Sequence, residues 1–123
     1  MKTFFFSAAI GIALIVGGML FDRCIEDFSA DMLKGCEVLE ERIKSGDAKG
    51  TADDVESFLN SKKTFLASII NHENLDEIET CITELKGYIA SNDIDEASVR
   101  CEKLKLLIER LPMEYGLSLQ NIL

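Results

Sequence analysis

The stretch from residue 21 to residue 43 reads FDRCIEDFSADMLKGCEVLEERI, and its spacing predicts a helix. Apolar residues recur every three or four positions, so they share one helix face. They are Phe21, Ile25, Phe28, Met32, Cys36, Leu39 and Ile43. Charged residues fill most positions between them, as in a helix with one face buried and the other in water. This pattern favours an all-α fold.

The segment before this helix is strongly apolar. Phe4–Phe21 reads FFFSAAIGIALIVGGMLF, eighteen residues without a charge. As a helix it would span about 27 Å, close to the ~30 Å hydrocarbon core of a bilayer. Lys2 precedes it, whereas acidic residues such as Asp22 and Glu26 follow it. The positive-inside rule then places the N-terminus in the cytoplasm and the rest of the chain outside.

A cleaved signal peptide is the alternative to a permanent anchor. Cleavage requires small residues just before the cut. Here the apolar run ends in Met-Leu-Phe at 19–21, and Asp22 follows. The sequence therefore favours an uncleaved transmembrane anchor over residues 1–21, in the cell membrane as a single pass. An acidic extracytoplasmic helical domain is expected over residues 22–123.

Three small residues in the apolar segment define a candidate helix-association face. Ala9, Ala13 and Gly17 are spaced four apart, so they lie along one side of a helix. Such a stripe lets two transmembrane helices approach closely. Small residues are also simply common in membrane helices. Self-association through this stripe is thus one hypothesis for the anchor.

The rest of the chain carries further helical patterns. The polar, glycine-containing loop SGDAKG at 45–50 ends the first helix. Thr51 is a plausible N-cap for the next one. Helical spacing then runs through residues 51–91, interrupted by NHEN at 71–74. The sequence leaves open whether residues 51–91 form one bent helix or two.

The last helix has clearer limits. Asp93 and Glu96 form a capping-box pattern after the turn around Asn92. Pro112 disfavours helical backbone at the preceding residue, so we expect the helix to end at Leu111. Three to four amphipathic helices with short loops predict a small antiparallel bundle.

The charge balance limits the partners. The chain has 22 acidic and 13 basic residues, and residues 22–123 carry a net charge of −10. Phosphate backbones require clustered cations, so nucleic acid is not expected as a partner. Anionic lipid headgroups would be repelled as well. A basic partner or loosely held cations fit this charge better.

Two of the four cysteines are placed to meet. Cys81 and Cys101 lie almost symmetrically about the turn at Asn92, so a helical hairpin brings them to similar heights. An extracytoplasmic location would permit a disulfide between them. The alternative is that both are small buried apolar side chains.

The chain shows no set of residues typical of an enzyme. His72 and Asp76 share a helix face and are a weak candidate for an interaction or ligand site. A catalytic metal needs about three converging ligands, and HENLD does not match the zinc-protease motif. We therefore expect no catalytic residues, no cofactor and no metal site.

Six short stretches from residue 62 onward follow a known family pattern. They are KKTF at 62–65, IINH at 69–72, LDEI at 75–78, LKGYI at 85–89, LKLLI at 104–108 and LSLQNIL at 117–123. In them the chain resembles the domain of unknown function 4363 family, short clostridial and related Firmicutes proteins with an N-terminal apolar segment. The resemblance implies a bacterial membrane-anchored helical protein with a membrane partner, and no reaction. Phe58, Phe65 and Asn74 depart from the family, which tends to have Trp near the first two and an acidic residue at the third.

Two functions follow as hypotheses. The first is a non-enzymatic single-pass membrane protein whose external bundle binds or supports another membrane or envelope protein, or associates with itself. The second is an extracytoplasmic sensor or cation- or ligand-binding module that uses the acidic surface or the region of His72 and Asp76.

Overall fold

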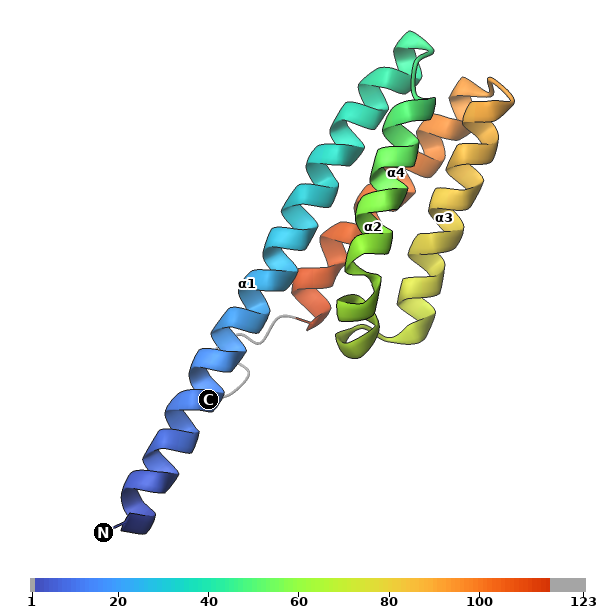
Figure 1. The fold of residues 1–123 in the computed structure, drawn as a ribbon. Coiled ribbons are helices and arrows are strands. Elements are labelled where there is room, and N and C mark those ends of the chain that lie inside the picture. Colours follow the sequence, from blue (N-terminus) through green and yellow to red (C-terminus); the bar gives the residue numbers. More distant parts are fainter. Residues whose placement is uncertain (1, 116–123) are drawn as a thin grey trace.

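In the computed structural model, residues 2–115 form four α-helices that run alternately up and down (Figure 1). They are α1 (Lys2–Ser45), α2 (Lys49–Ile69), α3 (His72–Ala90) and α4 (Ile94–Tyr115). The structure describes the backbone of residues 2–115 and the side chains of residues 7–16, 20 and 23–114. Within these residues every regular element is a helix. The predicted all-α class and antiparallel bundle are confirmed.

Helix α1 is twice the length of its neighbours. Its 44 residues span about 66 Å at 1.5 Å per residue. The N-terminal part extends well beyond the other three helices (Figure 1). At its far end Gly46 has φ of 80°, a left-handed conformation that glycine adopts without steric cost. The apolar segment and the amphipathic helix predicted after it are thus parts of one continuous helix.

One face of each helix contributes to a single apolar core. In α1 the predicted stripe is buried from its second member onward, whereas Phe21 lies outside the described side chains. The buried members are Ile25, Phe28, Met32, Cys36, Leu39 and Ile43. The other helices add fully buried side chains such as Leu59, Leu66, Ile78, Leu85, Leu104 and Ile108. Burial of these side chains is the main stabilising contribution to the bundle.

The region between residues 51 and 91 contains two helices. Ile70 ends α2 in an extended conformation, with φ of −101° and ψ of 142°. The Asn71 side chain then accepts a hydrogen bond of 3.1 Å from the Glu73 N–H and caps α3. The NHEN stretch therefore contains a helix start, because an N-cap side chain satisfies a donor that the helix leaves unpaired.

The two predicted N-caps have different outcomes. The cap at Thr51 is wrong, since α2 begins at Lys49 and the Ala48 carbonyl already accepts from the Ala52 N–H at 2.8 Å. The cap at Asp93 is confirmed, because its side chain accepts from the Glu96 N–H at 3.3 Å.

Helix α4 continues past Pro112, so the predicted end at Leu111 is wrong. Proline has no N–H to donate to the carbonyl four residues earlier, which belongs to Ile108. The hydroxyl of Ser29 on α1 donates to that carbonyl at 3.1 Å, and Ser29 is buried. A side chain from another helix thus donates the hydrogen bond that Pro112, which has no N–H, cannot donate to this carbonyl.

Ser29→Ala is expected to destabilise the bundle by about 1–3 kcal/mol, because it leaves a buried carbonyl without this donor. In a Pro112→Ala background the same change should cost far less, since residue 112 then has an N–H for the Ile108 carbonyl. Urea unfolding of the purified full chain in detergent measures both effects. Equal losses in the two backgrounds would show that the serine and the proline are not coupled.

Candidate functional site

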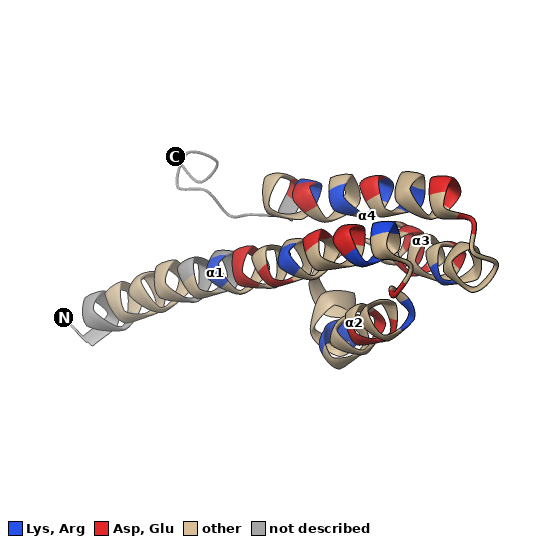
Figure 2. Cartoon of the chain, turned by 90° about the horizontal axis from the view of Figure 1, so that it is seen from above, with Lys and Arg blue, Asp and Glu red and all other residues tan. Residues whose placement is uncertain are grey.

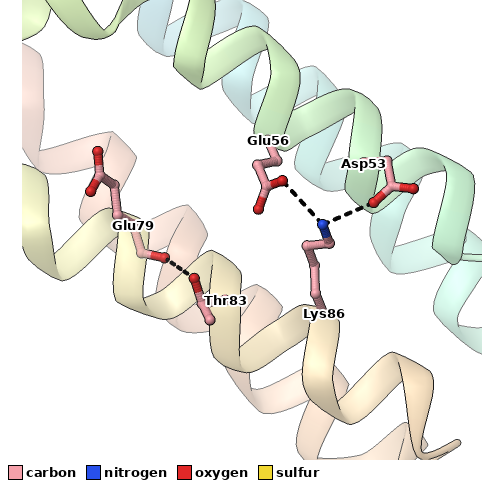
Figure 3. Close-up of polar contacts among 5 residues, drawn as sticks. All are labelled: Asp53, Glu56, Glu79, Thr83 and Lys86. Atoms are coloured by element: carbon pink, nitrogen blue, oxygen red, sulfur yellow. Dashed lines mark hydrogen bonds and ion pairs between the residues drawn. The ribbon is translucent and has the colours of Figure 1, made fainter.

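Near the end of α3, Lys86 joins this helix to α2 (Figure 3). Its Nζ lies 3.0 Å from Asp53 Oδ1 and 3.1 Å from Glu56 Oε1. Hydrogen bonds to the two carboxylates raise the pKa of Lys86, since they favour the charged ammonium. About one turn away, the Thr83 hydroxyl donates to the Glu79 carbonyl at 3.0 Å, within α3. Lys86 is therefore a charged link between helices and is unsuited to act as a base.

Other ion pairs also join neighbouring helices. They are Lys63–Glu79 at 2.9 Å between α2 and α3, Arg100–Glu84 at 2.7 Å between α4 and α3, and Lys105–Glu40 at 3.3 Å between α4 and α1. Pairs that remain in contact with water add little to stability. They link α2 to α3, α3 to α4 and α4 to α1 at the surface of the bundle.

His72 and Asp76 lie together, as their spacing on one helix face predicts. His72 Nε2 is 3.5 Å from Asp76 Oδ2, and the histidine side chain is 86% exposed. Among the described residues no group of three or more His, Cys, Asp or Glu side chains is arranged to hold a metal. The pair supplies two exposed groups, and its role as a ligand site stays a hypothesis.

Three of the four cysteines lie in the core. Cys36, Cys81 and Cys101 are buried, whereas Cys24 is exposed. All four are free thiols in the structure. Cys81 Sγ donates to the Arg100 carbonyl at 3.3 Å, and Cys101 Sγ donates to the Cys36 carbonyl at 3.5 Å. The structure thus places Cys81 and Cys101 as buried thiols, and a disulfide between them stays a hypothesis.

Thiol labelling is expected to distinguish free thiols from a disulfide between Cys81 and Cys101. In the folded, unreduced chain only Cys24 should react quickly, because it is exposed and the other three thiols are buried. After unfolding without reductant, four thiols should react per chain if all are free. Two reactive thiols, rising to four after reduction, would instead establish a Cys81–Cys101 bridge.

The buried thiols should make the bundle less stable at alkaline pH. Desolvation raises the pKa of Cys36 from 9.0 to about 12 and that of Cys101 to about 11. Both groups keep their protons in the folded state while the unfolded chain loses them above pH 9, so stability falls as pH rises. Between pH 8 and 10 the free energy of unfolding should drop by up to about 1.4 kcal/mol per cysteine. Cys36→Ala should reduce the total drop by the share of one cysteine, up to about 1.4 kcal/mol, in urea unfolding at the two pH values. An unchanged drop would contradict this prediction.

The N-terminal half of α1 presents apolar side chains that no other helix covers. Ile12 is 63% exposed and Leu14 is 72% exposed. No described residue from Ser7 to Leu20 is charged, in contrast with the bundle (Figure 2). Ala9 and Ala13 are exposed on this projecting segment. Gly17, the third member of the proposed association face, lies outside the described side chains.

The apolar run at Phe4–Phe21 includes residues 4–6, 17–19 and 21, whose side chains are not described. Within the described residues, no helix has an apolar stretch of sufficient length and hydropathy to cross a bilayer.

A comparison with known protein families identifies the family to which the bundle belongs. The family model described as Domain of unknown function (DUF4363) matches residues 19–122. The chain belongs to the DUF4363 family. The match includes all of α2, α3 and α4 and the part of α1 that packs on them. No curated protein and no solved structure matched this DUF4363 chain.

Several contacts of this DUF4363 bundle were missed from the sequence. Lys86 and Glu56 are 30 positions apart, and Ser29 and Ile108 are 79 apart. Neither pair follows a local spacing rule, because each depends on how two helices pack. The one local signal was Pro112 itself, whose missing N–H requires that the Ile108 carbonyl find another donor.

Proposed function

We propose that the chain is a non-enzymatic, single-pass membrane protein whose external helical bundle binds or supports another envelope protein. The observation that carries the proposal is the projecting half of α1, a helix of exposed apolar side chains beyond the bundle. Exposed apolar surface of this extent is typical of a segment that contacts lipid or another protein. The charge-free run at Phe4–Phe21 has the length of a membrane anchor.

The flanking charges orient the proposed anchor. Lys2 and the amino terminus lie on one side of the apolar run, and acidic residues begin at Asp22 on the other. Basic flanks stay in the cytoplasm, so the bundle is held outside. The net charge of −10 on residues 22–123 favours separation of the bundle from anionic headgroups. A continuous α1 would transmit the position of the anchor to the bundle as one rod.

A binding role suits the chemistry of the bundle better than catalysis does. Most of the described ion pairs join one helix to another, and the buried thiols have raised pKa values that keep them protonated. Catalysis requires a nucleophile or base together with a stabilising group in one place. Lys86 and Cys36 are each held in the protonation state that is unreactive. The bundle therefore offers surfaces and a fixed shape.

Chemical crosslinking of the full chain in native membranes, followed by affinity isolation, tests the proposed function. We expect one defined adduct with another membrane or envelope protein, or with a second copy through the face of Ala9, Ala13 and Gly17. Ala13→Leu should abolish the adduct between copies and leave a heterologous adduct intact. A chain that stays monomeric and without a partner in the membrane would contradict the proposal.

A further inference from the structure

The contact between α1 and α2 differs from the other three helix contacts of the bundle. The pairs α2–α3, α3–α4 and α1–α4 are each joined by at least one ion pair. Among the described residues, none joins α1 to α2. Figure 2 shows α1 between α4 and α2, with a contact on each side. The polar links therefore fasten α1 on its α4 side and leave its α2 side to apolar packing.

Two hollows lie end to end along this contact, and we name them together the α1–α2 groove. One hollow has a volume of about 390 Å³ and lies between positions 24–31 of α1 and positions 58–65 of α2. The other has a volume of about 240 Å³ and lies between positions 31–38 of α1 and positions 51–58 of α2. Asp31 and Phe58 border both hollows. From Cys24 to Val38 the groove follows about 21 Å of α1, the length of four helical turns.

The floor of the groove is apolar and well fixed. The rings of Phe28 and Phe58 stack across the two helices, with centroids 5.7 Å apart and planes 8° from parallel. A Cβ built at Gly35 would lie 3.2 Å from Val55 Cγ2, so the two helices approach closely there. The partly exposed surface of Phe58, together with Val38, thus forms a preorganised apolar strip.

The rim of the groove is acidic. Asp27 and Asp31 border it from α1 and Asp54 borders it from α2, whereas Lys62 is its single described cation. None of these four residues takes part in an ion pair among the described side chains. Elsewhere in the bundle, Asp53, Glu56, Glu84 and Glu40 have cationic partners, whereas other exposed carboxylates such as Asp95 and Glu109 have no ion pair among the described side chains. The carboxylates of the groove are therefore available to cations of another molecule.

We propose that the α1–α2 groove receives a basic amphipathic segment of the partner protein, whose apolar side chains contact Phe58 and Val38 while its Lys or Arg side chains pair with Asp27, Asp31 and Asp54. The inference rests on the proposed function, since it specifies the surface through which the bundle binds another envelope protein. An apolar strip with charged edges matches the way amphipathic helices are held in grooves. Charge complementarity of this kind mainly sets specificity and the rate of association.

The same charges argue against other occupants. A second copy of the chain would bring a bundle with a net charge of −10 against an acidic rim. Anionic headgroups would be repelled for the same reason. A cation alone would leave the apolar floor uncovered, and no metal-holding group was found among the described residues.

Site-specific photo-crosslinking of the full chain in native membranes tests the assignment. Two valines of similar exposure provide the matched positions: Val38 in the groove, 47% exposed, and Val99 on α4, 55% exposed. Each is replaced in turn with p-benzoylphenylalanine, as Val38→p-benzoylphenylalanine and Val99→p-benzoylphenylalanine, and the adduct is sequenced by mass spectrometry. We expect an adduct from position 38 alone, at a peptide that combines apolar residues with Lys or Arg.

Charge neutralisation then tests the rim. Asp27→Asn, Asp31→Asn and Asp54→Asn together should lower the yield of the position-38 adduct by about tenfold, on the order of three weak ion pairs. The control removes three exposed carboxylates from α4, as Asp95→Asn, Glu96→Gln and Glu109→Gln, with the same change in net charge. It should leave the yield unchanged, and an equal fall in both triple variants would overturn the acidic rim.

The outcomes separate the groove from the proposed function. A heterologous adduct from position 99 alone would keep the binding function and overturn the groove. An adduct from position 38 with a second copy, with lipid, or with a peptide that lacks basic residues would also overturn the groove. The absence of an adduct from position 38 would contradict the groove, whereas the binding function would be contradicted only if chemical crosslinking of the full chain also found it monomeric and without a partner.

Discussion

Ile12→Asp combined with Leu14→Asp is expected to release the chain from the membrane. Both side chains lie near the middle of the apolar run at Phe4–Phe21 and are exposed on the projecting half of α1. An aspartate at the centre of a transmembrane helix costs about 2.5–3.5 kcal/mol. Two of them therefore shift the balance toward the aqueous phase by roughly a thousandfold or more. Membrane flotation followed by immunoblotting measures the bound fraction.

The matched control places the same two charges on the bundle. Val99→Asp combined with Leu106→Asp alters two side chains of α4 that are also more than half exposed. This variant should float with the membranes as the unaltered chain does, because α4 is held in water. Equal release of the two double variants would mean that net charge, and not the apolar segment, governs the association.

Leu104→Ala is expected to cost the bundle about 2–5 kcal/mol of unfolding free energy. Leu104 has no exposed surface and lies in the core that all four helices share. Truncation removes its apolar contacts and leaves a cavity that the neighbouring helices cannot fill completely. Small domains have only about 5–15 kcal/mol in total, so the loss is a large part of the stability. Urea unfolding of the full chain in detergent, followed by circular dichroism, measures it.

Leu106→Ala makes the same chemical change two positions along α4. Leu106 is 56% exposed, so its truncation should change the free energy of unfolding by no more than about 0.5 kcal/mol. A similar loss in both variants would show that α4 is rotated relative to the structure described above.

The parts of the fold that follow local rules could be predicted from the sequence. The spacing of Ile25, Phe28 and Met32 identified the buried face of α1, because one period of 3.6 residues decides which side chains share a face. The cap at Asp93 was predicted for a similar reason, since its acceptor and the donating N–H are three residues apart.

The remaining features depend on packing between distant helices. The end of α4 was misjudged at Pro112, because the donor to the Ile108 carbonyl is Ser29 on another helix. The polar stretch at Asn71 left open whether residues 51–91 form one bent helix or two, since such a stretch is compatible with a kink and with a helix cap. The α1–α2 groove was not visible in the sequence, because its acidic rim combines Asp27 with Asp54 across two helices.

The candidate sites show the same division. The i, i+4 spacing placed His72 beside Asp76. The symmetry about Asn92 predicted only similar heights for Cys81 and Cys101, and the structure buries both. The sequence could not determine whether the two thiols are bridged, because that depends on geometry and on redox conditions.

Alkaline carbonate extraction combined with protease digestion of intact protoplasts tests whether the projecting half of α1 anchors an external bundle. We expect the chain to stay in the membrane pellet after extraction. Protease added outside should digest the bundle and leave a short membrane-embedded fragment. A chain recovered in the supernatant would show that α1 is not an anchor, and a bundle digested only after the protoplasts are lysed would show that it is not external.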